Sequence, residues 1–168
     1  NSAITAPSGS TGGLTLLAGR SALLNHSINT TNGALTIKAN HDDGTAAVSA
    51  NRLAGAAEIT MGTSGTIATG TGAVNISIMD GTGLTTNTSG SIGLKAITGG
   101  SLSVFNRGTT TGSAINITGT LNASGAIDIA AEYGNIALAG DLRTTNASGR
   151  AVCGDFDGAD LSHCFNCQ

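Results

Sequence analysis

A short phrase recurs five times in this chain of 168 residues. It reads GGLTL, GALTI, GAVNI, GGSLSV and GAIDI, and the copies begin at Gly12, Gly33, Gly72, Gly99 and Gly125. Each copy has one or two glycines followed, directly or after a small residue, by an apolar, a polar and an apolar residue. Self-similarity at a period of about 20 to 30 residues is typical of stacked-repeat architectures. The recurrence therefore predicts a chain that winds through the same conformation again and again.

The first apolar residue after each glycine marks an equivalent position in every repeat. We expect these five side chains to stack in one buried ladder, made of Leu14, Leu35, Val74, Leu102 and Ile127. The gap between Leu35 and Val74 is the longest, and we interpret it as two turns, with the second entering near Ala56–Met61. The glycines are expected at corners where φ is positive or the backbone is crowded.

Each repeat has the pattern of β-strands rather than of a helix. The triplets LTL, LTI, VNI, LSV and IDI alternate apolar with polar residues at period two, and a second short run follows in each unit. Glycine and β-branched residues recur too often for a sustained helix. The polar members of the triplets are expected to point outward; they are Thr15, Thr36, Asn75, Ser103 and Asp128.

The composition favours a thin aliphatic interior. The chain has 26 glycines, no Trp, one Tyr and three Phe, so it has few of the large rings that normally anchor a compact core. Frequent Ile, Val and Thr argue against disorder. The sequence therefore predicts an all-β fold, a right-handed parallel β-helix of about six turns, roughly 30 Å long at the ~4.8 Å spacing between strands.

The charge pattern and the termini restrict the classes of partner. The net charge is −3, and no basic cluster suggests a nucleic acid or an anionic lipid. No apolar run reaches the ~18 residues of a membrane span. The chain opens on Asn1 without a signal peptide, so we read it as a piece of a longer protein. A coil leaves a strand edge at each end, which predicts either a continuing rod or copies stacked end to end.

The repeats also resemble a known family. The segments GGLTLLAGRSALLNHSINTTNGALTIKAN (Gly12–Asn40), GSIGLKAITGGSLSV (Gly90–Val104) and SAINITGTLNASGAIDI (Ser113–Ile129) are similar to the repeats of filamentous-haemagglutinin-like adhesins, the large exoproteins of bacterial two-partner secretion. The resemblance covers about residues 4–149. It implies a right-handed β-helix, export through an outer-membrane barrel partner, and a place at the bacterial surface in adhesion or fibre formation, with a host or cell-surface receptor as a further partner.

Two departures from the family set the expected domain boundaries. The family's amino-terminal secretion domain is absent from these residues, and residues 150–168 do not follow the repeat. We therefore expect a β-helix repeat domain over 1–149 and an irregular tail, rich in Cys and Asp, over 150–168.

The tail contains all three cysteines, Cys153, Cys164 and Cys167. In an exported protein a disulfide is the first expectation, either Cys153–Cys164 or Cys164–Cys167, with the remaining thiol free to pair between chains. The family resemblance adds that some relatives have a Cys-closed loop near the C-terminus that tethers them to the secretion partner. Together with His163 the three thiols would also supply four zinc ligands.

Acidic residues in the tail raise the question of calcium. Asp155, Asp157 and Asp160 lie in a short loop with a glycine, where carboxylate oxygens can hold Ca²⁺. The loop lacks the terminal Glu of an EF-hand, so a solvated acidic turn is the alternative. The pair Asp42 and Asp43 poses the same choice between strands. No other cofactor is expected.

Seven Asn-x-Ser/Thr triplets are candidate glycosylation sites: Asn25, Asn29, Asn75, Asn87, Asn116, Asn122 and Asn146. In a chain so rich in Asn and Thr, many such triplets arise by chance. Asparagine at stacked corners also has a structural use, because its amide can form hydrogen bonds along a ladder.

Catalysis has little support in the sequence. His26, His41 and His163 lie in separate turns, and no strand carries the paired carboxylates that carbohydrate-cleaving enzymes need. We expect a non-enzymatic structural and adhesive segment. The alternatives are an ice-binding solenoid, which would need Thr at outward positions on every turn, and a polysaccharide-active β-helix enzyme.

Overall fold

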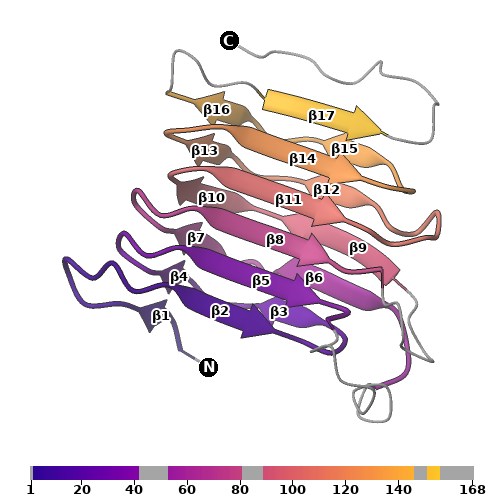
Figure 1. The fold of residues 1–168 in the computed structure, drawn as a ribbon, viewed down its shortest axis with the longest axis horizontal. Helices are drawn as coiled ribbons and strands as arrows, with labels where there is room; N and C mark the ends of the chain where they lie inside the picture. The colour runs from indigo at the N-terminus through magenta and orange to yellow at the C-terminus, as the bar shows by residue number, and fades with distance from the viewer. Residues whose placement is uncertain (1, 42–52, 81–88, 146–150, 156–168) are drawn as a thin grey trace.

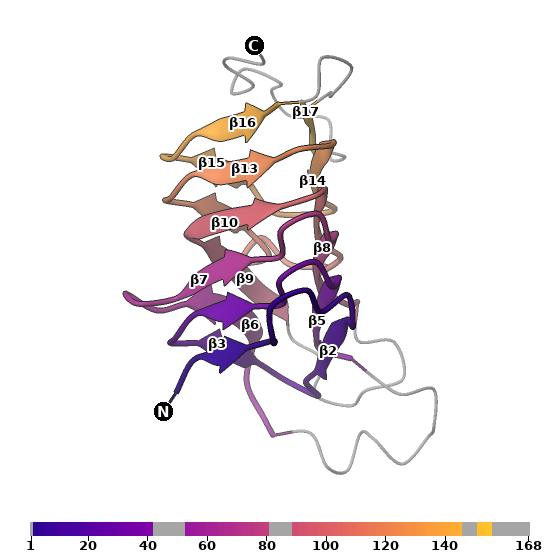
Figure 2. The same ribbon diagram turned by 90° about the vertical axis from the view of Figure 1, so that its left-hand side faces the viewer.

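The structure is a computed structural model that describes residues 2–41, 53–80, 89–145 and 151–155. These residues form strands and turns, and the strands are stacked in three parallel sheets, here named A, B and C (Figures 1 and 2). None of the described residues belongs to a helix long and apolar enough to cross a membrane.

The strands of each sheet follow one another at regular intervals along the chain. Sheet A contains β1 (Ile4–Thr5), β4 (Ile28–Asn29), β7 (Thr66–Ala68), β10 (Ala96–Gly99), β13 (Leu121–Ala123) and β16 (Leu142–Thr144). Sheet B contains β2 (Leu14–Leu17), β5 (Leu35–Ala39), β8 (Val74–Ile78), β11 (Leu102–Asn106), β14 (Ile127–Ala131) and β17 (Ala151–Asp155). Sheet C contains β3 (Ala22–Leu24), β6 (Ala57–Met61), β9 (Ser89–Leu94), β12 (Ile115–Ile117) and β15 (Ile136–Leu138).

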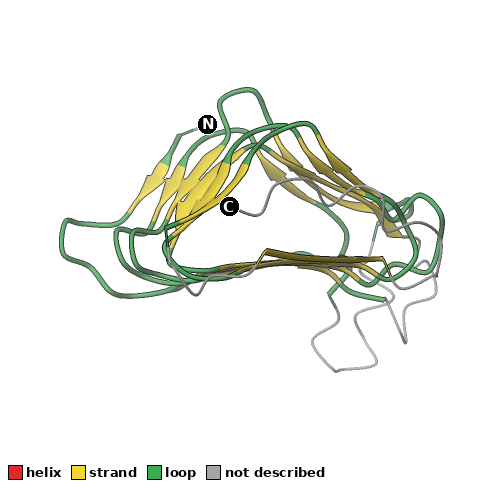
Figure 3. Cartoon of the chain, turned by 90° about the horizontal axis from the view of Figure 1, so that it is seen from above, coloured by secondary structure: helices red, strands yellow, loops and turns green. Residues whose placement is uncertain are grey.

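The chain visits the sheets in the order B, C, A and then returns to B. Each strand pairs in parallel with the strand one circuit earlier, so the three sheets enclose a common interior when seen from above (Figure 3). The prediction of an all-β fold built from parallel, repeated strands is confirmed. The expectation of two strands per repeat was wrong, because a run such as SIGLKAI divides at Lys95 into β9 and β10.

The residues that follow the glycines occupy one continuous row in sheet B. Leu14 pairs with Leu35, Leu35 with Val74, Val74 with Leu102, and Leu102 with Ile127. The last four are at most 1% exposed, and Leu14, at the end of the row, is partly buried. The neighbouring polar residues pair in the same register and stay unburied: Thr15, Thr36, Asn75, Ser103 and Asp128. Period-two alternation thus separates a buried row from a solvent-facing row on the same strands.

The direct pairing of Leu35 with Val74 corrects the interpretation of the longest gap. Ala57–Met61 does not form an extra rung of sheet B; it is strand β6 of sheet C, between β3 and β9. The two-turn interpretation was wrong, because the additional residues belong to one long connection, 40–56, within a single circuit.

Sheet B also continues past residue 149, where the sequence suggested that the repeat ends. The backbone of Ala151–Asp155 pairs with β14, and Ala151 stands opposite Ile127 in the row described above. The repeat pattern missed this strand because Val152 occupies the position at which the earlier copies have a polar residue.

Glycines form a column at the corner between sheets A and B, with one member per circuit: Gly12, Gly33, Gly72, Gly100 and Gly125. A Cβ on Gly33 would collide with the carbonyl oxygen of Gly12, and one on Gly72 would collide with that of Gly33. At Gly125 the added carbon would lie 2.8 Å from the Gly100 oxygen. None of these glycines has a positive φ, so crowding between successive circuits is what excludes a side chain here.

Buried threonines complete two of these corners. The hydroxyl of Thr69 donates to the carbonyl of Gly72 at 2.6 Å, and the amide of Gly72 donates back to the carbonyl of Thr69 at 2.7 Å. Thr30 and Gly33 form the same pair of hydrogen bonds one circuit earlier. Each closed turn satisfies backbone groups that would otherwise be buried without a partner.

The glycine column yields a first prediction. Gly72→Ala should lower the free energy of unfolding by about 1–3 kcal/mol, because the new methyl group meets backbone atoms of the circuit below. The matched control is Gly12→Ala, at the end of the column, where the nearest atom is 3.8 Å away; its effect should stay within about 0.5 kcal/mol. Urea denaturation of both variants measures the difference, and equal losses would contradict the crowding explanation.

Candidate functional site

The connections between sheets B and C differ in length more than those at either other corner. They span residues 18–21, 40–56, 79–88, 107–114 and 132–135, and we call this side of the molecule the B–C edge. Connections from sheet C to sheet A stay within the length of 62–65. Because insertions in repeat proteins gather on one side, which is often the binding side, the B–C edge is the candidate functional site.

Asn106 anchors the described connection 107–114 from inside the stack. It lies at the end of β11 and is fully buried. Its Nδ2 donates to the carbonyl oxygens of Gly90, at 3.0 Å, and Ala114, at 3.2 Å, while its Oδ1 accepts from the amide of Gly108 at 3.0 Å. A single side chain therefore joins both ends of the connection to the strand below.

A second buried asparagine lies lower on the same edge. Asn40 follows β5 in a left-handed conformation, with φ at 52°. Its Nδ2 donates to the carbonyl of Met79 at 3.1 Å and to the hydroxyl of Ser89 at 3.3 Å. Asparagine tolerates this backbone region better than most residues, and its amide links two successive circuits at the ends of β5, β8 and β9.

Ser89 extends this polar network upward. Thr110 Oγ1 donates to the carbonyl of Ser89 at 3.2 Å and lies 3.3 Å from the hydroxyl of Ser113. Ser89 and Ser113 are both buried, and no buried side-chain polar atom among the described residues lacks a partner. The edge thus combines a rigid, satisfied base with connections of variable length.

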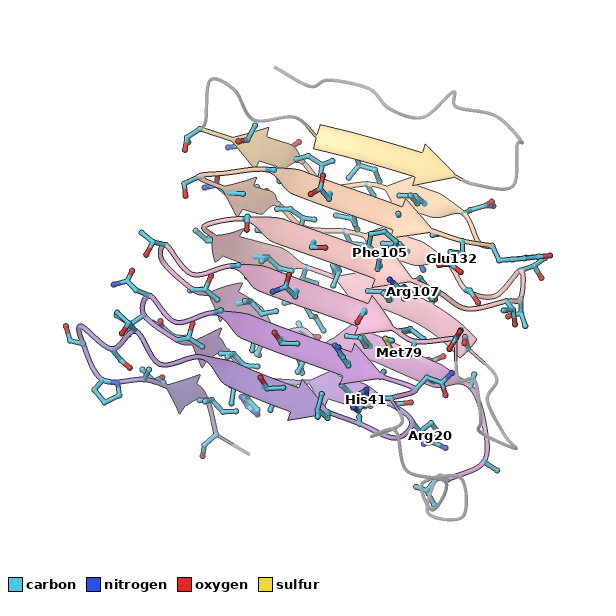
Figure 4. All side chains as sticks on the ribbon, viewed as in Figure 1. Arg20, His41, Met79, Phe105, Arg107 and Glu132 are labelled. Atoms are coloured by element: carbon cyan, nitrogen blue, oxygen red, sulfur yellow. The ribbon has the colours of Figure 1, made fainter. Side chains whose placement is uncertain are left out.

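Charged and aromatic side chains cover the outside of this base. Figure 4 shows Arg20, His41, Met79, Arg107 and Glu132 following one another along the edge. The Arg107 guanidinium lies over the Phe105 ring, 5.6 Å from its centroid, and its Nε is 3.9 Å from Glu132 Oε1.

The Arg107–Glu132 pair is half exposed, so it contributes little to stability. Tyr133, the next residue, is 53% exposed. Together with Phe105, these groups offer a cation, a carboxylate and rings to a partner.

The lower part of the edge is tied to the stack through the connection 18–21. Arg20 Nη1 donates to the carbonyl of Ala54 at 2.7 Å, and the Ser21 hydroxyl accepts from the Glu58 amide at 3.1 Å. These contacts hold the return of the longest connection against the first circuit.

The predicted tail sites fall mostly outside the described residues. Cys153 and Asp155 lie in β17, where Cys153 stands opposite Ile129 and Asp155 opposite Ala131. The other members of those predicted sites, Asp157, Asp160, His163, Cys164 and Cys167, and the pair Asp42 and Asp43, lie outside the described residues. Within the described part of the chain, no three His, Cys, Asp or Glu residues are grouped so that they could hold a metal ion.

Five of the seven glycosylation candidates can be placed in the fold; Asn87 and Asn146 lie outside the described residues. Asn25 is exposed at the turn after β3, Asn29 is exposed on β4, and Asn75 is exposed on β8. Asn116 on β12 and Asn122 on β13 are partly exposed. Asn29 has a local structural role as well, since its Oδ1 accepts from the Thr31 amide at 2.8 Å.

The strand triplets among these candidates have a structural explanation. In Asn75, Asn116 and Asn122 the middle residue of each triplet is a buried core residue, and the first and third positions face out. Outward polar and inward aliphatic residues alternate along a strand, and this alternation alone produces Asn-x-Ser/Thr triplets, whether or not the asparagine is glycosylated.

Sequence reasoning did not find the B–C edge. The available signals were the long gap between Leu35 and Val74 and the asparagines that follow the apolar runs, in LTIKAN and LSVFN. Both signals are also expected of ordinary turns. Whether such an asparagine is buried depends on the neighbouring circuits, which the sequence does not show.

No family model, curated protein or solved structure matches this chain. The geometry of the fold and of the B–C edge is therefore the basis for a functional proposal.

The buried anchor yields a second prediction. Asn106→Leu keeps the side-chain size but leaves two carbonyls and one amide without their partner, which should cost about 2–4 kcal/mol of unfolding free energy. Asn116→Leu, on a partly exposed position of β12, is the control and should change stability by less than about 0.5 kcal/mol. Chemical denaturation gives the energies, and amide exchange should speed up at Gly108 in the first variant alone. Equal effects of the two substitutions would show that Asn106 does not anchor the connection.

Proposed function

We propose that this chain is a structural and adhesive segment of a secreted bacterial surface protein, a β-solenoid rod that projects from the cell or stacks into an extracellular fibre. The observation that carries the proposal is a structural contrast: the three-sheet stack is regular, whereas the connections at one edge, the B–C edge, are long and differ in length. A rod of this kind holds recognition groups at fixed spacing on a rigid support.

The resemblance of the repeats to filamentous-haemagglutinin-like adhesins supports the same proposal. The segments that carry it, Gly12–Asn40, Gly90–Val104 and Ser113–Ile129, supply strands to all three sheets. On this reading the rod is a right-handed β-helix of about six turns, and it reaches the cell surface through an outer-membrane secretion partner. The depth of sheets A and B, six described strands each, supports the number of turns.

Adhesion is assigned to the B–C edge because its exposed groups suit a polar receptor surface. Arg107 and Glu132 form a half-exposed pair, and the guanidinium lies over the Phe105 ring. Arginine and tyrosine are enriched among residues that dominate binding energies. We propose that these side chains contact a host or cell-surface receptor directly.

The alternative functions have less support. An ice-binding face needs a regular outward array of threonines, whereas the outward row of sheet B changes to Asn75, Ser103 and Asp128 after its first two members. A thermal-hysteresis assay separates that function from adhesion. A polysaccharide-active enzyme would need a pair of carboxylates beside a sugar-binding groove, and we propose a non-enzymatic role.

Adhesion can be tested with beads coated with the 168-residue chain and offered to host cells and immobilised matrix glycoproteins. The Arg107→Ala/Glu132→Ala variant should weaken attachment at least about fivefold, equivalent to about 1 kcal/mol of binding energy. The matched control is Asp141→Ala/Arg143→Ala, which removes an exposed pair, joined at 2.6 Å, at the start of β16 in sheet A. The control should bind like the wild type.

Two outcomes would contradict the adhesive role of this edge. If the coated beads attach to none of the surfaces, these residues do not have the proposed adhesive function. An equal loss in both double variants would show that general surface charge, rather than the B–C edge, determines attachment.

A further inference from the structure

Arg107 and Glu132 lie at successive levels of the B–C edge, and backbone hydrogen bonds fix both residues there. The amide of Arg107 donates to the carbonyl of Ile78 at 2.9 Å, and the amide of Glu132 donates to the carbonyl of Asn106 at 2.9 Å. These bonds continue the ladder of sheet B by one residue beyond β11 and β14. The two side chains therefore stand one above the other on a backbone that needs no rearrangement to present them.

These two side chains keep their hydrogen-bonding capacity for a ligand. Arg107 Nε is 3.9 Å from Glu132 Oε1, which is an ion-pair distance but too long for a hydrogen bond. Among the residues that the structure describes, neither the guanidinium nor the carboxylate makes a hydrogen bond. A guanidinium has five N–H donors and a carboxylate has two acceptor oxygens, so donors and acceptors stand side by side at the half-exposed surface.

Aromatic rings lie next to this pair. The Arg107 guanidinium lies over the Phe105 ring, 5.6 Å from its centroid, and this contact limits the positions that the long side chain can take. Figure 4 shows Phe105, Arg107 and Glu132 close together where β11 and β14 end. Tyr133 follows Glu132 directly and is 53% exposed, so its ring is available to an apolar surface of a ligand.

The charges of this site argue against a purely ionic ligand. A cation and a carboxylate 3.9 Å apart oppose each other, so neither an anion nor a cation gains a large net attraction. A neutral sugar fits these groups better, because neighbouring hydroxyls of a pyranose both donate and accept hydrogen bonds. A pyranose also has a face of C–H groups, which suits an exposed aromatic ring.

We propose that Arg107, Glu132 and Tyr133 bind a neutral hexopyranose of a receptor glycan through two neighbouring hydroxyls. One hydroxyl accepts from Arg107, the other donates to Glu132, and the C–H face of the sugar lies against the Tyr133 ring. The inference rests on the proposed function and deepens it, since it names the chemical class that the B–C edge recognises. A single contact on an open surface is weak, so firm attachment needs many copies on one surface.

Sugar probes test the binding directly. Polyacrylamide conjugates of mannose, glucose and galactose are offered to beads coated with the 168-residue chain, with sialic acid conjugates and bare polyacrylamide for comparison. We expect at least one neutral conjugate to bind, and the free methyl glycoside of that sugar to displace it. The proposal is wrong if no neutral conjugate binds, or if the sialic acid conjugate alone does.

Substitutions at the ion pair separate hydrogen-bond geometry from charge. Arg107→Ala/Glu132→Ala should weaken binding of the neutral conjugate at least about tenfold. Arg107→Lys keeps the charge but lacks the planar fork of donors, so it should also lose at least about fivefold. Asp141→Ala/Arg143→Ala, which removes the exposed pair at the start of β16, should bind like the wild type. An Arg107→Lys variant with wild-type binding would contradict the proposed hydroxyl contacts.

Tyr133 offers a matched pair of substitutions. Tyr133→Phe keeps the ring and should retain binding, whereas Tyr133→Ala should lower it at least about threefold. Equal binding by these two variants would contradict the contact between the ring and the sugar. Because Tyr133, Arg107 and Glu132 are all exposed, circular dichroism should show the wild-type fold in every variant.

Periodate distinguishes a failure of this proposal from a failure of the adhesive function. Periodate breaks the carbon–carbon bond between neighbouring sugar hydroxyls and leaves polypeptide backbones intact. Attachment of coated beads to host cells should therefore fall at least about fivefold after the cells are treated with periodate and then borohydride. Attachment that survives periodate and is lost after trypsin would mean a protein receptor, so the adhesive function would stand and the sugar site would fall. Beads that bind a neutral conjugate but no host surface would support the sugar site and contradict adhesion.

Discussion

Parallel, in-register backbone pairing is the constraint on which the rest of this structure depends. Once Leu35 pairs with Val74 and Val74 with Leu102, every residue of a strand has its counterpart one circuit away at the distance between strands. Like residues then stack on like residues, which fills a narrow interior with aliphatic side chains. The same constraint brings the corners so close together that Gly33 and Gly72 have no space for a Cβ.

At the B–C edge the lengths of the connections vary, although the strands that they join keep their register. Connections as different in length as 18–21 and 40–56 join sheets B and C there, while the strands on both sides keep their register. Buried amides make this possible: Asn40 and Asn106 satisfy backbone groups of adjacent circuits at the points where the chain departs. Length can therefore change outside the core without loss of hydrogen bonds inside it.

The sequence was most informative where a feature repeats and least informative where it occurs once. The ladder from Leu14 to Ile127 follows from periodicity alone, since each copy has the same local pattern. Periodicity could not decide whether the residues between Leu35 and Val74 form another circuit or a long connection, because both have the same local alternation at Ala57–Met61. Asn106 was missed for a related reason: its partners, Gly90 and Ala114, become neighbours only after the circuits stack. The strand at Ala151–Asp155 escaped because Val152 breaks the polar alternation.

The triplets at Asn75, Asn116 and Asn122 have a consequence for reading other stacked β-proteins. Their spacing is the spacing of side chains along a strand, with small polar groups outside and an aliphatic residue such as Ile76 or Ile117 inside. In such folds the number of matches to the glycosylation motif rises with the number of strands. A search that counts each match as independent evidence of a carbohydrate attachment will therefore overestimate glycosylation. The informative comparison is with the frequency expected from shuffled outward positions, and only an excess over that background bears on modification.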